Sequence, residues 1–243
     1  MFDQERLEQN RIKSVNAVHE SHFHQFIHED LMDRLEPIDK KFQEILLIDP
    51  PIKHIIIDQL TECKPHIIST SQIAEQEPHK YDLIIFPFGF HWLSDVQEFL
   101  SSAYKILKPD GMFICNFPAG GSLNNLRRRL LELETSHTQT HAPHISPFIQ
   151  FEHVTPLLQQ AGFTENIIDM EQLELEYDSP LALMHAIKNT GEANALASTP
   201  SYSINHDMYK ELQNNSAPFT DHINLVTFLS SPTKNSIKLK SEE

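Results

Sequence analysis

The sequence predicts an α/β fold built on a mostly parallel sheet. A short apolar strand at residues 83–86 is followed by an amphipathic helix over 95–107 and by a second strand at 112–115. Two strands joined through a helix form a right-handed crossover unit, which is the building block of parallel sheets. Residues 108–111, Lys-Pro-Asp-Gly, predict a turn in which proline presets φ and glycine supplies a positive φ.

The chain before this unit reads as helix, strand, helix and strand. An amphipathic helix is expected over 14–36, with Pro37 ending it. Its apolar stripe comprises Phe23, Phe26, Ile27, Leu31 and Leu35. The apolar run at 45–48 predicts a buried strand, residues 52–63 predict a helix that starts at Pro51, and a small strand is expected at 66–69.

The chain after this unit predicts three helices and two strands. Ser122 is the expected cap of a helix to Glu134, and Gly162 is the expected C′ residue of a helix over 152–161. The remaining elements are a polar loop at 135–147, strands at 167–177 and 223–229, and a helix near 180–190 between those strands. These elements predict one domain over 1–230, including a helical segment at 1–43, with a polar tail at 231–243.

Composition narrows the classes of partner and of compartment. The formal net charge of −15 disfavours nucleic acid, whose binders need clustered Lys and Arg. No apolar run reaches the roughly 20 residues of a membrane span. The polar N-terminus is unlike a targeting peptide, and two cysteines are too few for a disulfide framework, so a cytoplasmic protein is expected.

Glycine is scarce. The chain has six glycines, whereas an average usage of about 7% would give about seventeen, and none occurs before Gly89. The first third of the chain therefore lacks the residue that adopts positive φ without a steric cost.

The crossover unit carries a recognisable motif. Tyr81-Asp82-Leu83, His91-Trp92-Leu93 and Leu107-Lys108-Pro109-Asp110-Gly111 together resemble the class I methyltransferases of the type-11 group, which use S-adenosylmethionine (SAM). The resemblance implies a Rossmann-like class I methyltransferase fold, with a seven-stranded type of sheet whose last strand is antiparallel. It implies nothing about the substrate.

Further motifs resemble one subfamily, which contains the methyltransferase-fold mitochondrial complex I assembly factor and its alphaproteobacterial relatives. These motifs occupy residues 2–6, 31–35, 123–127, 144–148, 160–163 and 191–196. The resemblance covers residues 1 to about 230 and is weakest between 49 and 80.

The weak stretch is where that family holds its cofactor. Family members place a glycine-rich loop after the first strand and an acidic residue at the end of the second. Here the first strand runs into Asp49-Pro50-Pro51, and Ser69-Thr70 falls where the acidic residue is expected. Two prolines remove two N–H donors at that loop. The cofactor half is thus expected to be reduced and SAM to be absent, with a different SAM-holding loop as the alternative.

The candidate site residues follow from these motifs. Asp49, Phe88 and His91 are the residual candidates for a cofactor pocket, because each follows a predicted strand at the edge where ligands bind in open α/β sheets. Trp92 is expected to be a packing residue. The substrate or partner candidates are His91, Arg127, His144, Ser146, Phe148, Glu192 and Asn194. A partner would then meet an exposed surface around 137–148 and 191–196.

Other reactive residue types give no site. His24 and His28 have a chelating i, i+4 spacing, but no Cys or carboxylate cluster accompanies them, so exposed histidines and no metal are expected. His137, His141 and His144 lie in a loop that reads equally well as solvated or as binding. Neither cysteine has a context that lowers the pKa of its thiol, so no catalytic nucleophile is predicted.

These observations predict a methyltransferase-fold pseudoenzyme that acts through protein binding in respiratory complex I assembly, with a respiratory complex subunit as its partner. The alternative is an active SAM-dependent methyltransferase on a protein or a carrier-bound acid. A decaying gene product is a third reading.

Overall fold

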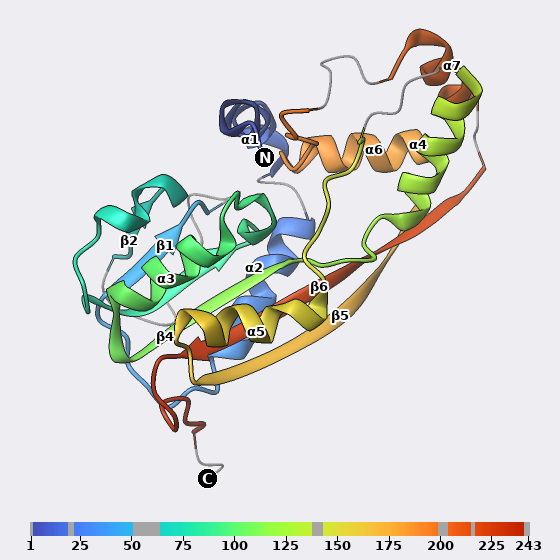
Figure 1. The fold of residues 1–243 in the computed structure, drawn as a ribbon. Helices are drawn as coiled ribbons and strands as arrows, with labels where there is room; N and C mark the ends of the chain where they lie inside the picture. The colour runs from blue at the N-terminus through green and yellow to red at the C-terminus, as the bar shows by residue number, and fades with distance from the viewer. Residues whose placement is uncertain are drawn as a thin grey trace. The chain divides into compact units, whose positions relative to one another are not determined.

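A computed structural model describes residues 2–18, 22–50, 64–137, 143–198, 204–214 and 217–240, with the side chains of 15–18 excepted (Figure 1). The predicted helix over 52–63 lies outside the described residues, as do Cys63 and His141. In chain order the elements are α1 (Gln4–Val18), α2 (His22–Leu35), β1 (Ile45–Ile48), β2 (His66–Ile68), η1 (Thr70–Glu75), β3 (Tyr81–Pro87), η2 (Phe90–Trp92), α3 (Val96–Ile106), β4 (Leu107–Pro118), α4 (Asn124–His137), α5 (Phe151–Ala161), β5 (Glu165–Tyr177), α6 (Pro180–Asn189), α7 (His206–Asn214) and β6 (Phe219–Ser231).

The sheet confirms the predicted fold class. Six strands lie in the order β2-β1-β3-β4-β6-β5. The pairs β1–β2, β1–β3 and β3–β4 are parallel, and β6 runs antiparallel to β4. Helix α3 connects the parallel strands β3 and β4, and the antiparallel strand β6 comes last in the chain, as the sequence resemblance implies.

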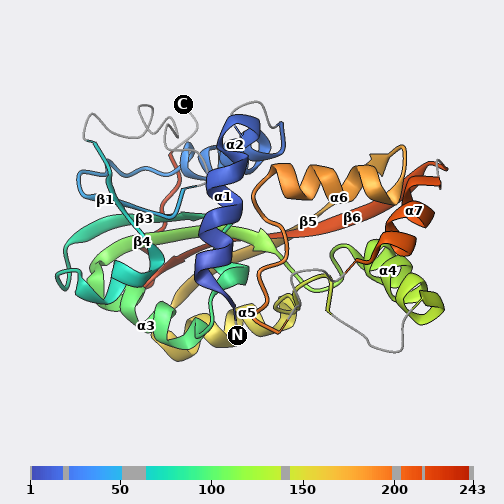
Figure 2. The ribbon, with the colours of Figure 1, turned by 90° about the horizontal axis from the view of Figure 1, so that it is seen from above.

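The chain divides into two compact units. The sheet unit comprises His22–Pro118, Ile149–Glu171 and Leu225–Glu243, and the helical unit comprises Met1–Ser21, Ala119–Phe148 and Gln172–Asn224. Both β5 and β6 contribute residues to both units. In the sheet unit, α3 and α5 cover one face of the strands and α2 lies against the other face (Figures 1 and 2).

The central strands are apolar because both faces of the sheet are covered. Every residue of β1 and β3 is buried, and so is every residue of β4 from Gly111 onward. Parallel strands between two helical layers have no solvent face, so they read as continuous apolar runs rather than alternating ones. That is why the sequence located β1 and β3 well.

The prediction for the N-terminal helices was wrong in two respects. One helix was expected over 14–36, but α1 already begins at Gln4, and α2 begins at His22. The sequence missed α1 because its apolar stripe is thin: Leu7 is buried, whereas Ile12 is 64% exposed. His24 was expected at the surface but is buried at 1% exposure, on the same face of α2 as Ile27 and Leu31.

The prediction of a positive φ at Gly111 was also wrong. Residues 107–118 form one strand, with a register shift against β3 near Asp82, and Gly111 is not among the residues with positive φ. Position 111 requires glycine because neighbouring atoms leave no room for a Cβ. A Cβ there would lie 2.8 Å from Leu107 Cδ2 and 2.9 Å from the Lys108 carbonyl oxygen. By contrast, Gly162 is confirmed as the left-handed C′ residue of α5, with a φ of 109°.

Helix α4 has a cap that differs from the predicted one. The Ser122 hydroxyl donates to the Ala119 carbonyl at 2.6 Å instead of accepting from an amide of the helix. The Asp221 carboxylate of β6 accepts from the first amides of α4, at 3.3 Å from Asn125 N and 2.7 Å from Leu126 N. A cap that lies about a hundred residues away along the chain leaves no local signal. The local sequence therefore predicted Ser122, a residue type that commonly caps helices.

A buried polar network joins helix α2 to strands β4 and β6 and to the residue after β3. The Asn116 amide, at 0% exposure, donates to the Ile27 carbonyl at 2.9 Å and to Asp30 Oδ2 at 3.0 Å. Its Oδ1 accepts from Phe88 N at 3.2 Å. Asp30 also accepts from the Thr227 hydroxyl at 2.8 Å and pairs with the Arg34 guanidinium at 2.9 Å.

We expect Asn116→Ala to lower the free energy of unfolding by about 3 kcal/mol, because it leaves a buried carboxylate and a buried carbonyl with fewer donors. Urea denaturation followed by circular dichroism measures the change. The matched control is Asn189→Ala, at an exposed position, which should stay within about 0.5 kcal/mol of the wild type. Equal effects of the two substitutions would contradict the role of the network.

Candidate functional site

The candidate residues fall into the two units. Asp49, Phe88 and His91 belong to the sheet unit. Arg127, His144, Ser146, Phe148, Glu192 and Asn194 belong to the helical unit.

Asp49 directly follows β1 and is hydrogen-bonded to the last residue of β2. Its φ of 40° is in the left-handed region, and its amide donates to the Ile68 carbonyl at 3.0 Å. Its Oδ2 accepts from Thr70 N at 2.9 Å and from the Thr70 hydroxyl. Thr70 opens the 3-10 helix η1, so this carboxylate caps that short helix. An internal donor thus occupies one oxygen at the edge where a ligand would lie.

Phe88 and His91 follow β3 and lie among aromatic rings. Phe88 has a φ of 47°, is 4% exposed, and contacts the Phe23 ring edge-on at a centroid distance of 5.0 Å. The His91 ring lies 5.2 Å from the Phe88 ring and 4.8 Å from the Trp92 ring. His91 and Trp92 are each 5% exposed. Trp92 is buried as expected of a packing residue, and His91 is buried beside it.

The described residues at this edge do not match what the sequence resemblance requires for SAM. No glycine follows β1, because Asp49 and Pro50 stand there, and Ser69 and Thr70 rather than a carboxylate follow β2. The residue with positive φ after β3 is a buried phenylalanine instead of a glycine. Among the described residues, this edge therefore carries the buried Phe88 ring and an Asp49 carboxylate that accepts from Thr70.

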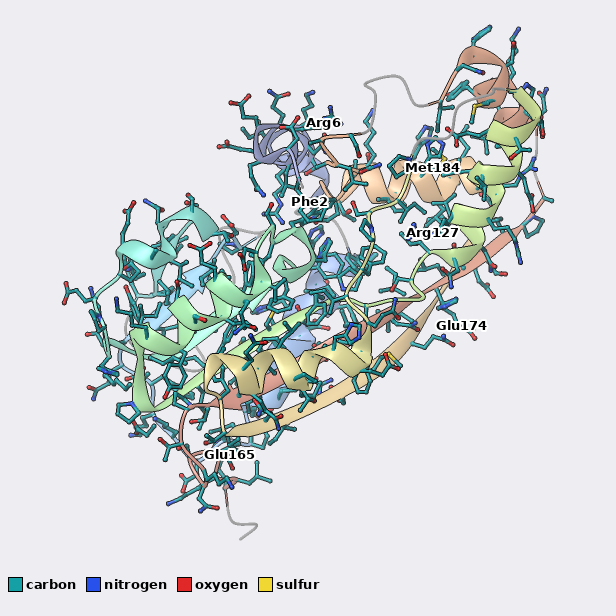
Figure 3. All side chains as sticks on the ribbon, viewed as in Figure 1. Phe2, Arg6, Arg127, Glu165, Glu174 and Met184 are labelled. Atoms are coloured by element: carbon teal, nitrogen blue, oxygen red, sulfur yellow. The ribbon has the colours of Figure 1, made fainter. Side chains whose placement is uncertain are left out.

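Arg127 holds the last described part of the 135–147 region. It projects from α4, and its Nη1 donates to the Ile145 carbonyl at 3.1 Å and its Nη2 to the Ser146 carbonyl at 3.2 Å (Figure 3). Burial lowers the pKa of the guanidinium. The planar fork of arginine suits two neighbouring carbonyl oxygens. Arg127 therefore acts as a structural clamp in the described residues.

His144 and Ser146 lie beside this clamp. His144 Nε2 is 2.9 Å from Glu134 Oε1, and the two side chains are only 7% and 4% exposed. The Ser146 hydroxyl is buried and has no hydrogen-bond partner among the described residues. Phe148 is half-buried. The sequence missed Glu134 as a partner, because it reads only as one of the acidic neighbours of Arg127-Arg128-Arg129.

His137 has a different role from His144. His137 ends α4, and its Nε2 lies 2.8 Å from Glu211 Oε2 of α7. Together with Arg129, at 2.9 Å, it holds the pKa of the Glu211 carboxyl below its ordinary value. These contacts fasten α7 to α4.

Residues 191–196 contact the chain's own N-terminal helix. Arg11 Nη2 of α1 pairs with Glu192 at 3.1 Å, and the Glu192 side chain is 6% exposed. The backbone of 193–196 receives three further bonds, from Asn10 Nδ2 to Ala193 O, from Asp3 N to Ala195 O and from Arg6 Nη1 to Leu196 O. Asn194 donates to the Pro143 carbonyl at 2.5 Å. The expectation of an exposed surface here was wrong: Ala195 and Leu196 are buried beneath these contacts.

Gly191 permits this approach. Its φ is 82°, and a Cβ there would lie 2.6 Å from Ser14 Oγ and 3.1 Å from Arg11 Cα. The sequence signal that could have revealed the contact is the pair of matched motifs at 2–6 and 191–196. They lie far apart in the chain, and the structure brings them together at the start of α1, where Phe2 and Arg6 lie (Figure 3).

The described ranges hold neither a metal-ion cluster nor a membrane-spanning helix. No three His, Cys, Asp or Glu side chains gather around a point that would suit a metal ion among the residues the structure describes. Every helix in those same ranges is too short or too polar to cross a bilayer.

Comparison with known proteins identifies the class. The family model of the methyltransferase domain matches residues 16–169, which is more than half of the chain, so the chain belongs to the methyltransferase domain family. The solved structure of a Bacillus halodurans C-125 protein, described as a putative methyltransferase, has a TM-score of 0.52. It covers 85% of this chain and 99% of its own, at 12% identity, which supports the fold alone.

Several curated proteins are similar to this chain. "Putative methyltransferase RP459" of Rickettsia prowazekii (strain Madrid E) is 47% identical over 166 residues, 68% of this chain and 74% of that protein. The human "Arginine-hydroxylase NDUFAF5, mitochondrial" is 34% identical over 133 residues, 53% of this chain. The match spans 39% of the human protein's length. The "Malonyl-[acyl-carrier protein] O-methyltransferase 1" of Coxiella burnetii is 31% identical over 114 residues, 47% of this chain and 38% of that protein.

We expect Arg127→Ala to loosen residues 143–148, because two carbonyl oxygens lose a charged donor. Amide hydrogen exchange in that segment should become about tenfold faster. Arg127→Lys should restore only part of the protection, because a lysine ammonium cannot present two parallel N–H donors to the two carbonyl oxygens. Arg128→Ala is the matched control, because Arg128 is exposed and, among the described residues, bonds to Asn125 of the same helix at 3.1 Å. Exchange that is equally fast in both alanine variants would contradict the clamp.

Cys115 should be chemically silent in the folded protein. Its side chain is fully buried, and burial raises the pKa of the thiol well above its ordinary value, whereas the thiolate is the reactive form. In a Cys63→Ser variant, the remaining thiol should react with Ellman's reagent only after denaturant is added. A rapid one-to-one reaction in native buffer would show that Cys115 is accessible and reopen it as a nucleophile.

Proposed function

We propose that this chain is a methyltransferase-fold pseudoenzyme, which does not hold SAM and acts by binding a protein partner. The observation that carries the proposal is the combination of residues and bonds at the ends of β1 and β2. An Asp49 carboxylate oxygen accepts a hydrogen bond from Thr70 N, and Pro50 and Pro51 stand after Asp49 where the family has glycines.

The backbone chemistry of that edge supports the first half of the proposal. A nucleoside cofactor in an open α/β sheet needs backbone N–H groups and a close approach at the first turn. Proline provides no N–H and cannot adopt positive φ. The carboxylate that would receive the ribose hydroxyls has no counterpart at Ser69-Thr70. The aromatic cluster of Phe23, Phe88 and His91 offers carbon surface beside the same edge.

The relatives support the second half. The human relative is named an arginine hydroxylase rather than a methyltransferase, so the matched region occurs in a protein whose named activity is not methyl transfer. The sequence motifs resemble the subfamily of the complex I assembly factor. We therefore propose that the partner is a subunit of a respiratory complex during its assembly. On the composition of the chain, we also propose that the protein lies in the cytoplasm.

An active methyltransferase on a protein or a carrier-bound acid is the second candidate function. The observation that favours it is the match to the Coxiella burnetii enzyme, which is named for methyl transfer to a carrier-bound acid. On this reading another part of the chain supplies the contacts that the β1 edge lacks.

Isothermal titration of the folded protein with SAM and with S-adenosylhomocysteine decides between the two candidates. We expect no heat of binding up to millimolar ligand. Pro50 and Pro51 lack the N–H groups that would bind the cofactor, and Ser69-Thr70 lacks the carboxylate that would accept from the ribose hydroxyls. The Coxiella burnetii relative serves as the positive control under identical conditions. Saturable binding at micromolar strength, about 8 kcal/mol, would overturn the pseudoenzyme proposal and favour the methyltransferase.

A further inference from the structure

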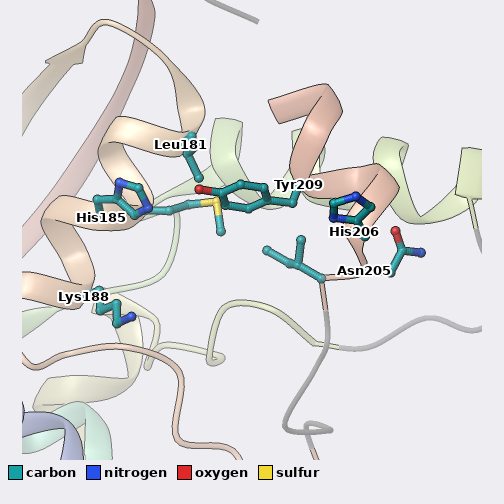
Figure 4. Close-up of a pocket in the computed structure, with 8 residues that line it drawn as sticks. Leu181, His185, Lys188, Asn205, His206 and Tyr209 are labelled. Atoms are coloured by element: carbon teal, nitrogen blue, oxygen red, sulfur yellow. The ribbon is translucent and has the colours of Figure 1, made fainter. Parts of the chain in front are cut away.

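The helical unit contains an open cleft between α6 and the start of α7. Its volume is about 370 Å³. That volume lies at the lower end of the range of ligand-binding clefts, about 300–1,000 Å³. Leu181, Met184, His185, Lys188, Ile204, Asn205, His206 and Tyr209 line it (Figure 4).

The sequence of α6 explains why these side chains share one surface. Leu181, Met184, His185 and Lys188 recur at the i, i+3, i+4 and i+7 spacing of a single helical face. Leu183 is buried at 1% exposure, whereas Met184 is only half-buried. Across the cleft, Tyr209 of α7 is 41% exposed. Accessible methionine and tyrosine side chains are enriched where proteins bind one another.

The charge of the cleft is opposite to that of the chain. Three of its lining residues are basic types, Lys188, His185 and His206, and none is acidic, although the net charge of the chain is −15. The Asn205 side chain accepts from Asp207 N at 3.0 Å and from Met208 N at 2.9 Å. These amides at the start of α7 are therefore already bonded, and the three basic side chains are the groups left to meet an anion.

We propose that this cleft binds a segment of the protein partner in which an apolar side chain stands beside carboxylates. The apolar side chain lies among Leu181, Met184 and Tyr209, and a carboxylate pairs with Lys188, with the imidazoles of His185 and His206 as further donors. An apolar floor with a charged rim is the usual composition of a peptide-binding surface. This inference rests on the proposed function and names the chemistry of its partner.

The test uses model peptides and the full chain labelled at its methionine methyl groups. Met184→Leu assigns the Met184 resonance among the six methionines. The acidic probe is acetyl-Ser-Glu-Leu-Phe-Glu-Ser-amide, and two matched probes replace both glutamates by lysine or replace Leu-Phe by Ser-Ser. We expect the acidic probe alone to move the Met184 resonance in a saturable way.

Charge reversal of the cleft sharpens this test. Lys188→Glu should weaken binding of the acidic probe by about tenfold or more and favour the lysine probe. Lys210→Glu is the matched control. It makes the same change at an exposed position of α7 that does not line the cleft, so it should leave binding near the wild-type level.

Several outcomes would overturn the inference. One is a Met184 resonance that the acidic probe leaves in place up to millimolar concentration, and another is an equal shift with all three probes. A shift that depends on protein concentration alone would assign the cleft to a second copy of the chain. A shift with octanoate but not with the peptides would make it a small-molecule site. Each of these is independent of SAM titration, so failure here is distinguishable from failure of the pseudoenzyme proposal.

Discussion

The contact on which the sheet unit depends is the one between the Asn116 amide and Asp30. Asn116 lies near the end of β4, before Pro118, and its amide bonds Phe88 after β3 and the backbone of α2. Asp30 in turn holds Thr227 of β6 and Arg34, which reaches Asp169 of β5 at 2.8 Å. A fully satisfied network in a low dielectric fixes one arrangement, because a shift of any member leaves a buried polar group unpaired. Strands β4 and β6 thus have one position relative to α2.

The edge held in this way is the one at which open α/β sheets bind ligands, and its described residues contact one another. Asp49 caps η1 through Thr70, and Phe88 and His91 pack with rings. Polar groups that have internal partners gain little by exchanging them for a ligand. In the helical unit the same holds for Glu192 and for the backbone of 193–196, which bind α1. The motifs that resemble the family are here largely internal contacts, which shifts attention to the unmatched surface of α6 and α7.

The elements with a strong pattern were predictable, and those with a distant partner were not. The buried runs of β1 and β3, the apolar stripe of α3 and the C′ glycine of α5 each carry a local signal. Helix α1 has a thin stripe, since much of what holds it lies at 191–196. The Asp221 cap of α4 and the Glu134 partner of His144 likewise come from remote positions. Residues 138–142 and 51–63 lie outside the described parts of the chain, so the predictions that fall there stay predictions.

The sequence by itself determined the fold class, the family and the loss of the glycine-rich motif, because each depends on residue types within a short window. Only the tertiary structure decided what the candidate residues contact. It turned Arg127 into a clamp on two carbonyls, buried His24 and His91, and covered Ala195 and Leu196 with α1. The physical reason is that a side chain's role depends on which donor or acceptor lies within about 3 Å of it, and that neighbour can be any residue of the chain.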